Sequence, residues 1–153
     1  MKPSATTWLG KNFESMVFDG LWIGEDIGLG QDIFVLTSTL LLETKTARIG
    51  TGIIPFTTHN IVRLARAGLS LYELGRDRFV FGTGVGGLQD LKRLGIELEK
   101  PVTGLRQAVD VVKRLWAGEK VTVKSEIFKL SKYSLDLRSP IHVPIFFGVR
   151  GPQ

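Results

Sequence analysis

The chain contains no cysteine, and this absence excludes disulfide bridges, thiolate metal sites and cysteine nucleophiles. Only two histidines are present, His59 and His142, and they lie too far apart in the sequence to indicate a metal site. No apolar run reaches the roughly 18 residues that a membrane-spanning helix needs, and the N-terminus lacks the apolar segment of a signal peptide. These absences predict a cytoplasmic protein with no metal site and no membrane contact.

Acidic residues are outnumbered, because 20 Lys and Arg stand against 15 Asp and Glu and give a net charge of +5. A basic balance favours acidic partners such as nucleic acids, phosphates or a polyanionic cofactor. The basic residues are scattered as on the solvated faces of helices, and they form no single basic stretch. We therefore expect a small-molecule substrate and no nucleic-acid partner.

Four short apolar runs predict β-strands: Gly20–Gly24, Arg48–Ile54, Arg78–Gly82 and Pro144–Val149. Each is bounded by glycine or charge, and none alternates cleanly between apolar and polar residues. Strands that are covered on both faces, as in a parallel sheet, have this pattern.

Helical segments separate these runs. Asp32 is expected to cap a helix over 33–44, a second helix is expected over 60–74 and ends at Gly75, and a third begins at Pro101. The apolar stripes predicted for the second and third helices are Ile61, Ala65, Leu69 and Tyr72, and Val102, Leu105, Val109, Val112 and Trp116. Alternating strands and helices imply βαβ crossovers and an α/β fold.

Two segments depart from this alternation. Residues 120–130 (KVTVKSEIFKL) predict a β-hairpin that leaves the sheet. At the N-terminus only 2–10 could supply an opening strand, and 12–17 is too short for a full helix. We therefore expect a single domain over 1–153 whose first βα unit, over 1–17, is degenerate.

Glycine-rich sequence follows three of the predicted strands, at 50–52, 82–87 and 148–151. In parallel α/β folds ligands gather at the carboxyl ends of strands, where glycine lets the backbone approach a ligand and lets N–H groups point at phosphate. Glycine also simply makes tight turns, and for any single loop this interpretation stays open. Three such loops together favour a ligand site.

The middle loop also matches G-x-G-x-x-G through Gly82, Gly84 and Gly87, after a strand and before a helix. A dinucleotide-binding unit needs a second strand that ends in an acidic residue about 20 positions later. Here residues 95–101 run straight into a helix. A Rossmann-type NAD(P) binder is therefore the weakest of the alternatives.

The order of these motifs resembles the luciferase-like monooxygenase superfamily, and especially its F420-dependent methylenetetrahydromethanopterin reductase branch. The resembling segments are FDGLWIGED at 18–26, ARIGTGIIP at 47–55, the helix after His59, RFVFGTG at 78–84, PVTGLRQAVDVVKRLW at 101–116 and PIFFGVRGP at 144–152. Their order and spacing match over about residues 18 to 152.

The resemblance implies a (β/α)₈ TIM-type barrel that holds reduced FMN or coenzyme F420 at the carboxyl ends of its strands. It implies an oxidoreductase that passes a hydride through the cofactor, or activates oxygen on FMN. The wording around Glu25–Gly28 favours F420 slightly over FMN. The substrate is not readable from the sequence.

The resemblance also implies cofactor-binding residues. Gly52 and Ile53 match the position where many relatives have a non-proline cis peptide behind the ring, and Thr83 and Gly84 match the segment that lines the ring and side chain. Gly148, Val149, Arg150 and Gly151 match the loop that often meets the cofactor phosphate through backbone N–H groups, to which Arg150 would add a charge. Gly52 as a plain strand glycine and Arg150 as an exposed C-terminal arginine are the alternatives.

Glu25 and Asp26 are the candidate catalytic residues, because they end a strand where many relatives carry an acid followed by histidine. Paired carboxylates at a strand end can donate or accept a proton near neutral pH. They can equally cap a helix and order a loop. The missing histidine argues against chemistry that needs imidazole at this point.

The length of the chain limits the functional prediction. A (β/α)₈ barrel typically needs about 250 residues, and this chain supplies only about four to five βα units with the hairpin excursion. We expect a partial barrel that is completed by a homo-oligomer or a complementary barrel chain. A curtailed chain, a smaller α/β sandwich, and a non-catalytic paralogue or cofactor-binding subunit are the alternatives.

Overall fold

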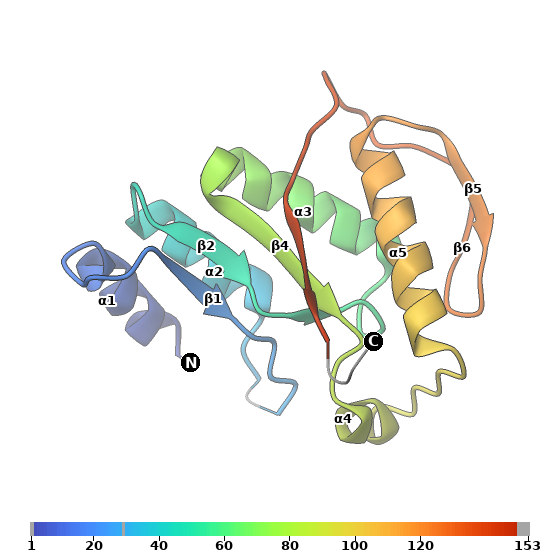
Figure 1. The fold of residues 1–153 in the computed structure, drawn as a ribbon, viewed down its shortest axis with the longest axis horizontal. Helices are drawn as coiled ribbons and strands as arrows, with labels where there is room; N and C mark the ends of the chain where they lie inside the picture. The colour runs from blue at the N-terminus through green and yellow to red at the C-terminus, as the bar shows by residue number, and fades with distance from the viewer. Residues whose placement is uncertain (1, 29, 150–153) are drawn as a thin grey trace. The chain divides into compact units, whose positions relative to one another are not determined.

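A sheet with parallel strand pairs and the helices that connect its strands form the main part of the fold (Figure 1). The structure is a computed structural model that describes residues 2–28 and 30–149. The strands of this sheet are β1 (Gly20–Ile23), β2 (Arg48–Thr51), β3 (Ile54–Pro55), β4 (Phe79–Gly84) and β7 (Ile145–Gly148). Their order is β1-β2-β4-β3, and β7 also pairs with β4. The four predicted strands are thus confirmed.

The chain divides into two compact units. The first comprises Met1–Ile54, Ser70–Thr83 and Val143–Gln153, and the second comprises Pro55–Leu69 and Gly84–His142. The first unit therefore holds β1, β2 and β7 with nearly all of β4.

The parallel registers give the sheet of the first unit two different faces. Trp22 pairs with Gly50, and Gly50 pairs with Val80, so these residues share one face. Ile49 pairs with Phe79 on the other face, where both side chains are fully buried. We call the face that carries Trp22 the inner face, and helices α1 (Pro3–Phe13) and α2 (Ile33–Glu43) lie on the opposite side of the sheet (Figure 1).

Helix α2 begins as the sequence predicts. The Asp32 carboxylate accepts hydrogen bonds from the backbone N–H groups of Phe34 and Val35 at 2.9 and 3.1 Å, which satisfies two donors of the first turn. Its inward face is formed by buried residues one or two turns apart, namely Ile33, Leu36, Thr37, Leu40 and Leu41.

The expectation of an opening strand at 2–10 is wrong, because α1 spans Pro3–Phe13. Proline suits the first position of a helix, and Thr6, Gly10 and Phe13 are buried at helical spacing. Gly10 lies against α2, where a Cβ atom would stand 2.6 Å from Cβ of Glu43. The segment is therefore helical because it packs closely against α2, and this contact with a distant segment leaves no signal in the local sequence pattern.

Two charged side chains connect separate segments of this unit through hydrogen bonds. The Glu14 carboxylate accepts hydrogen bonds from the backbone N–H groups of Lys45 and Thr46, in the loop between α2 and β2. The Arg78 guanidinium donates to Oγ1 of Thr44 at 3.0 Å and to two backbone carbonyl oxygens, at 3.3 Å and 3.0 Å, near the end of α2. These contacts fix the start of β2 and of β4 relative to the helices.

The second unit is built around α5 (Pro101–Trp116). The indole N–H of Trp116 donates to the carbonyl oxygen of Ala65 at 2.8 Å, within the part of α3 (Ile61–Gly75) that belongs to this unit. The predicted hairpin is present as antiparallel strands β5 (Val121–Lys124) and β6 (Lys129–Tyr133), and the short helix α4 (Leu88–Arg93) precedes α5.

The predicted helices are confirmed to within two residues, but their buried stripes are rotated. In α5 Val102 is exposed and Val109 is half-buried, while Ala108, Val111 and Leu115 are buried. In α3 Leu69 and Tyr72 are half-buried, whereas the buried residues are Ile61, Leu64, Ala65, Gly68, Leu71 and Gly75. Small residues at the helix contacts move the buried stripe, because they let a neighbouring side chain such as Trp116 approach Gly68 closely.

Candidate functional site

The carboxyl ends of β1 and β2 are joined by backbone hydrogen bonds. The Gly52 N–H donates to the Ile23 carbonyl oxygen at 2.6 Å, and the Glu25 N–H donates to the Ile53 carbonyl oxygen at 3.2 Å. The peptide bond between Gly52 and Ile53 is cis, as the family resemblance implied. The structure thus brings three of the predicted site residues, Glu25, Gly52 and Ile53, to one place.

Gly148, at the end of β7, lies beside the same segment. A Cβ atom on Gly148 would stand 2.7 Å from Cγ2 of Ile53, and one on Gly24 would stand 2.9 Å from the Gly52 oxygen. These glycines are therefore required by close packing of the strand ends themselves. Gly24, Gly52 and Gly148 are nevertheless exposed, so backbone atoms reach the surface at these strand ends, beside the side chains of Trp22 and Ile53.

A flat ligand could lie against this surface, which we call the glycine platform (Gly24, Gly52 and Gly148). Glycine at these positions lets a ring approach the backbone closely. The described residues therefore fit the ring of a flavin or deazaflavin, the group that the sequence implies. Gly52 and Ile53, which follow β2, and Gly148 and Val149, at and directly after the end of β7, are the residues that would hold it.

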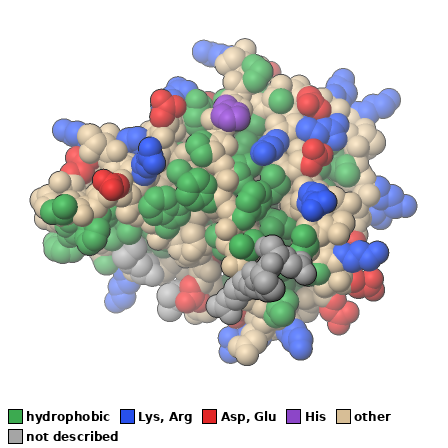
Figure 2. Space-filling view, viewed as in Figure 1, with side chains coloured by type: hydrophobic (Ala, Val, Ile, Leu, Met, Phe, Trp, Pro, Cys, Tyr) green, Lys and Arg blue, Asp and Glu red, His purple; other side chains and the backbone are tan. Residues whose placement is uncertain are grey.

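Two aromatic side chains stand next to the glycine platform on the inner face. Trp22 lies across β2, and its indole occupies the space where side chains on Gly50 and Gly52 would project. Phe146 of β7 stacks with Trp22 at a centroid distance of 6.3 Å and an interplanar angle of 16°. Both rings are exposed, and Figure 2 shows hydrophobic side chains gathered over the strands on this side.

Thr83 and Gly84 have different surroundings from the three glycines of the platform. The Thr83 hydroxyl donates to the Ile54 carbonyl oxygen at 2.9 Å, and the side chain is buried. Gly84 lies in the second unit, where its carbonyl oxygen accepts from the Phe56 N–H at 3.1 Å. The predicted contact of these two residues with a cofactor stays a prediction.

The two candidate acids differ in their surroundings. Glu25 is half-buried and its backbone is held to Ile53. Asp26 is exposed, and its Oδ1 accepts a hydrogen bond from the Gly28 N–H at 2.9 Å, which orders the loop after β1. The geometry therefore gives Asp26 a local structural contact and sets Glu25 beside Ile53.

The remaining predicted residues lie at the end of the chain. Val149 is exposed directly after β7. Arg150 and Gly151 lie outside the residues that the structure describes.

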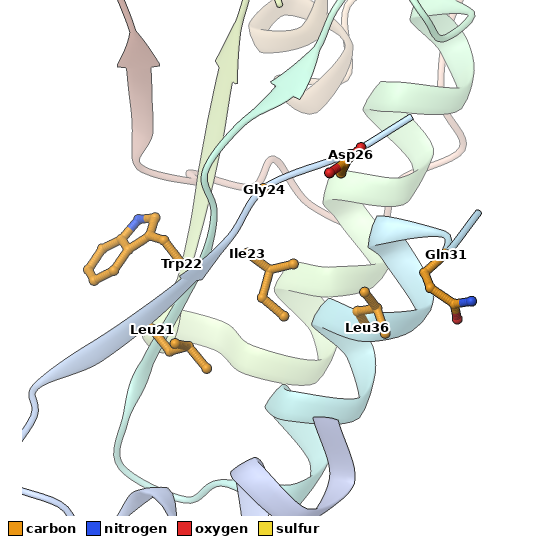
Figure 3. A pocket seen from close by; sticks show the side chains of 7 residues that line it. All are labelled: Leu21, Trp22, Ile23, Gly24, Asp26, Gln31 and Leu36. Atoms are coloured by element: carbon orange, nitrogen blue, oxygen red, sulfur yellow. The ribbon is translucent and has the colours of Figure 1, made fainter. Parts of the chain in front are cut away.

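A small cavity of about 240 Å³ lies beside β1 (Figure 3). Its lining consists of Leu21, Trp22, Ile23, Gly24, Asp26, Gln31 and Leu36. Figure 3 shows the Ile23 side chain directed toward α2 and Trp22 directed to the other side of the strand. The cavity is smaller than the roughly 300–1,000 Å³ of typical ligand pockets.

Within residues 2–28 and 30–149 no group of acidic and histidine side chains is arranged to hold a metal ion. In the same part of the chain no helix has the length and apolar character to cross a bilayer.

Comparison with known proteins identifies the family to which the chain belongs. The family model described as luciferase-like monooxygenase matches residues 2–153, nearly the whole chain. The chain belongs to the luciferase-like monooxygenase family. The sequence resemblance is thereby confirmed.

Relatives in this family include two kinds of enzyme. The chain is similar to 5,10-methylenetetrahydromethanopterin reductase of Archaeoglobus fulgidus, with 30% identity over 141 residues that cover 92% of this chain and 42% of that protein. It is also similar to limonene 1,2-monooxygenase of Rhodococcus erythropolis, with 30% identity over 78% of this chain and 32% of that protein. The chain thus spans less than half the length of these curated relatives.

Solved structures support the fold. The coenzyme F420-dependent tetrahydromethanopterin reductase of Methanopyrus kandleri superposes with a TM-score of 0.85 at 20% identity, over 99% of this chain and 48% of that one. The α/β fold of this luciferase-like chain is therefore that of part of a TIM-type barrel, as predicted.

The sequence did not single out Trp22 and Phe146. Each lies two residues before a strand-end glycine, in GLWIG and in PIFFG, so each shares a face with Gly24 or Gly148. This spacing was the available signal. The pairing of the two rings depends on strands that are far apart in sequence.

Proposed function

We propose that this luciferase-like chain is part of an oxidoreductase that transfers a hydride with reduced F420 or FMN bound at the glycine platform. The observation that carries the proposal is the exposed glycine backbone at the ends of β1, β2 and β7. In parallel α/β folds this end of the sheet is where ligands bind. The cofactor supplies the hydride chemistry when it is bound.

The chain's own residues position the reacting groups. The hydrogen bonds from Gly52 to Ile23 and from Glu25 to Ile53 hold the backbone of the platform in a fixed shape. The half-buried Glu25 is proposed to donate or accept a proton at its carboxylate, and exposed Asp26 to order the loop that carries it.

F420 is proposed over FMN on the names of relatives. The reductase of Methanopyrus kandleri and an F420-dependent glucose-6-phosphate dehydrogenase of Kineococcus radiotolerans, 26% identical, both carry F420 in their names. FMN stays the second candidate, because a Baeyer–Villiger monooxygenase of similar fold from Pseudomonas putida is described in complex with FMN.

The barrel is proposed to be completed by further strands, from a second copy or a complementary chain. Within residues 2–28 and 30–149 β1 pairs with β2 alone, and Trp22 and Phe146 are exposed on the inner face. An open strand edge and an exposed apolar face both favour association with more sheet. In the completed barrel, loops of this chain and loops of the added strands are proposed to bind the substrate together.

Equilibrium titration of the purified chain with F420 and with FMN, followed by cofactor fluorescence, tests binding. Saturable binding of one of them supports the proposal, and no binding of either at any protein concentration overturns it. Native mass measured on the same sample reports whether the binding species is an assembly.

Turnover separates the catalytic proposal from its alternative. With reduced F420 and 5,10-methylenetetrahydromethanopterin as the first probe, Glu25→Gln is expected to bind cofactor normally and to lose at least about 100-fold in rate, the scale of general acid–base catalysis. Asp26→Asn is the matched control and is expected to retain most activity. Cofactor binding without turnover in the unaltered chain would instead favour a non-catalytic cofactor-binding subunit.

A further inference from the structure

The inner face of the first unit changes character within two residues of its strand ends. On β1, Trp22 precedes Gly24 by two residues, and on β7, Phe146 precedes Gly148 by two residues. Residues two apart in a strand point to the same face and stand about 6.6 Å apart along it, at roughly 3.3 Å per residue. The glycine platform is therefore bordered on the inner face by two aromatic side chains.

The position of Trp22 is set by the glycines of the neighbouring strand. Its indole lies where a side chain on Gly50 would project, and its Cβ atom would stand 2.9 Å from a Cβ atom on Gly52. Gly50 is buried, whereas Gly52 is exposed. The indole therefore lies across β2, and its bulk stands directly beside the exposed Gly52 of the platform.

Trp22 is held in this place without being buried. Its side chain is 42% exposed, and that of Phe146, which stacks with it, is 53% exposed. Single exposed apolar side chains are common on protein surfaces. Two stacked rings at the border of a candidate ligand site are different, because aromatic rings attract a further ring in stacked or edge-to-face geometry.

The platform needs such a border to fix the position of a ring. Gly24, Gly52 and Gly148 let a flat group approach the backbone, but they have no side chains that would stop it from sliding along the inner face. Trp22 and Phe146 stand on the side of the amino ends of the strands, which is the direction in which a ring would slide deeper over the sheet.

We propose that Trp22 is a positioning residue for the flavin or deazaflavin ring. Its indole, stacked with Phe146, meets the edge of a ring on the glycine platform and sets how far that ring extends over the inner face. The inference rests on the proposed function, because it needs a ring at the platform. Glu25 follows Gly24 on the same segment, so the stop and the proposed acid are held by one stretch of chain.

Oxidative footprinting of the unaltered chain tests the contact directly. Hydroxyl radicals oxidise exposed tryptophan side chains, and mass spectrometry measures the yield at each residue. Trp8 is the internal reference, because it is 61% exposed and belongs to α1, on the other side of the sheet (Figure 1). Saturation with F420 or FMN is expected to lower the oxidation of Trp22 several-fold relative to that of Trp8.

Substitution separates positioning from packing. Trp22→Ala is expected to raise the Kd of the cofactor about 10-fold, the scale of one lost aromatic contact. Trp22→Phe keeps a ring at this point and is expected to stay within about threefold of the unaltered chain. Trp8→Ala is the matched control and is expected to bind the cofactor like the unaltered chain. Circular dichroism checks the folding of each variant, and the footprint needs no variant.

Each of the other results overturns the inference. Trp22 that is protected before cofactor is added shows that other strands cover the aromatic pair. Saturable cofactor binding with unchanged oxidation of Trp22, or with an unchanged Kd in folded Trp22→Ala, shows that Trp22 does not position the ring, while the proposed function stands. An unaltered chain that binds neither cofactor overturns the proposed function, and this inference with it.

Discussion

Gly82→Ala is expected to be among the most destabilising single changes to the sheet. A Cβ atom on Gly82 would lie far inside van der Waals contact of the Thr51 carbonyl oxygen. That oxygen belongs to the backbone of β2 and cannot rotate away, so β2 and β4 would have to separate. Gly50→Ala differs, because its Cβ meets the indole of Trp22, a side chain that can move.

The magnitude follows from the hydrogen bonds that separation breaks. The Thr51 hydroxyl donates to the Gly82 oxygen and accepts from the Gly82 N–H, both at 2.8 Å, and both groups are buried. Losing two such bonds costs about 2 kcal/mol, and leaving buried groups unpaired adds about 1–3 kcal/mol. The expected loss of about 3–5 kcal/mol is a large share of the roughly 5–15 kcal/mol that stabilises a typical domain.

Urea unfolding followed by circular dichroism measures this loss, with an expected shift of the midpoint by about 1 M or more. Thr51→Val removes the hydroxyl without adding a clash and is expected to cost about 2 kcal/mol, while Thr51→Ser keeps the hydroxyl and is expected to stay within about 1 kcal/mol. A Gly82→Ala chain within 1 kcal/mol of the unaltered protein would refute the reasoning, because it would mean that the two strands have room to part.

Three further outcomes are expected. Hydrogen bonds from two backbone N–H groups of the α2–β2 loop lower the pKa of Glu14 from 4.5 to about 2, so its contribution to stability is present above pH 4.5 and is lost as pH falls towards 2. Glu14→Gln should flatten this acid dependence in urea titrations between those pH values. Arg78→Lys should cost about 1.5–3 kcal/mol because lysine cannot reproduce the guanidinium fork, whereas the same change at exposed Arg66 should stay within about 0.5 kcal/mol by thermal unfolding. Trp116→Phe should cost about 2–4 kcal/mol, since it removes buried volume together with the hydrogen bond to Ala65, and a loss below 1 kcal/mol would contradict the packing described for the second unit.

The strands and long helices could be predicted from the sequence because their signals are local. Asp32 caps α2 through its own side chain, and Pro101 begins α5 as expected. The first helix could not be predicted in this way. Its core residues, including Gly10, are buried only because α2 lies against them, and a glycine in that role gives no apolar signal.

The sequence predicts where the candidate site lies, but not all of the side chains that surround it. Glycine-rich strand ends identified Gly52 and Gly148, because all parallel strands end at the same edge of a sheet. The buried hydroxyl of Thr83 depends on which face of β4 carries it, and the Trp22–Phe146 pair depends on the order β1-β2-β4-β7. Face and order are set by pairing between distant segments, which one sequence does not display.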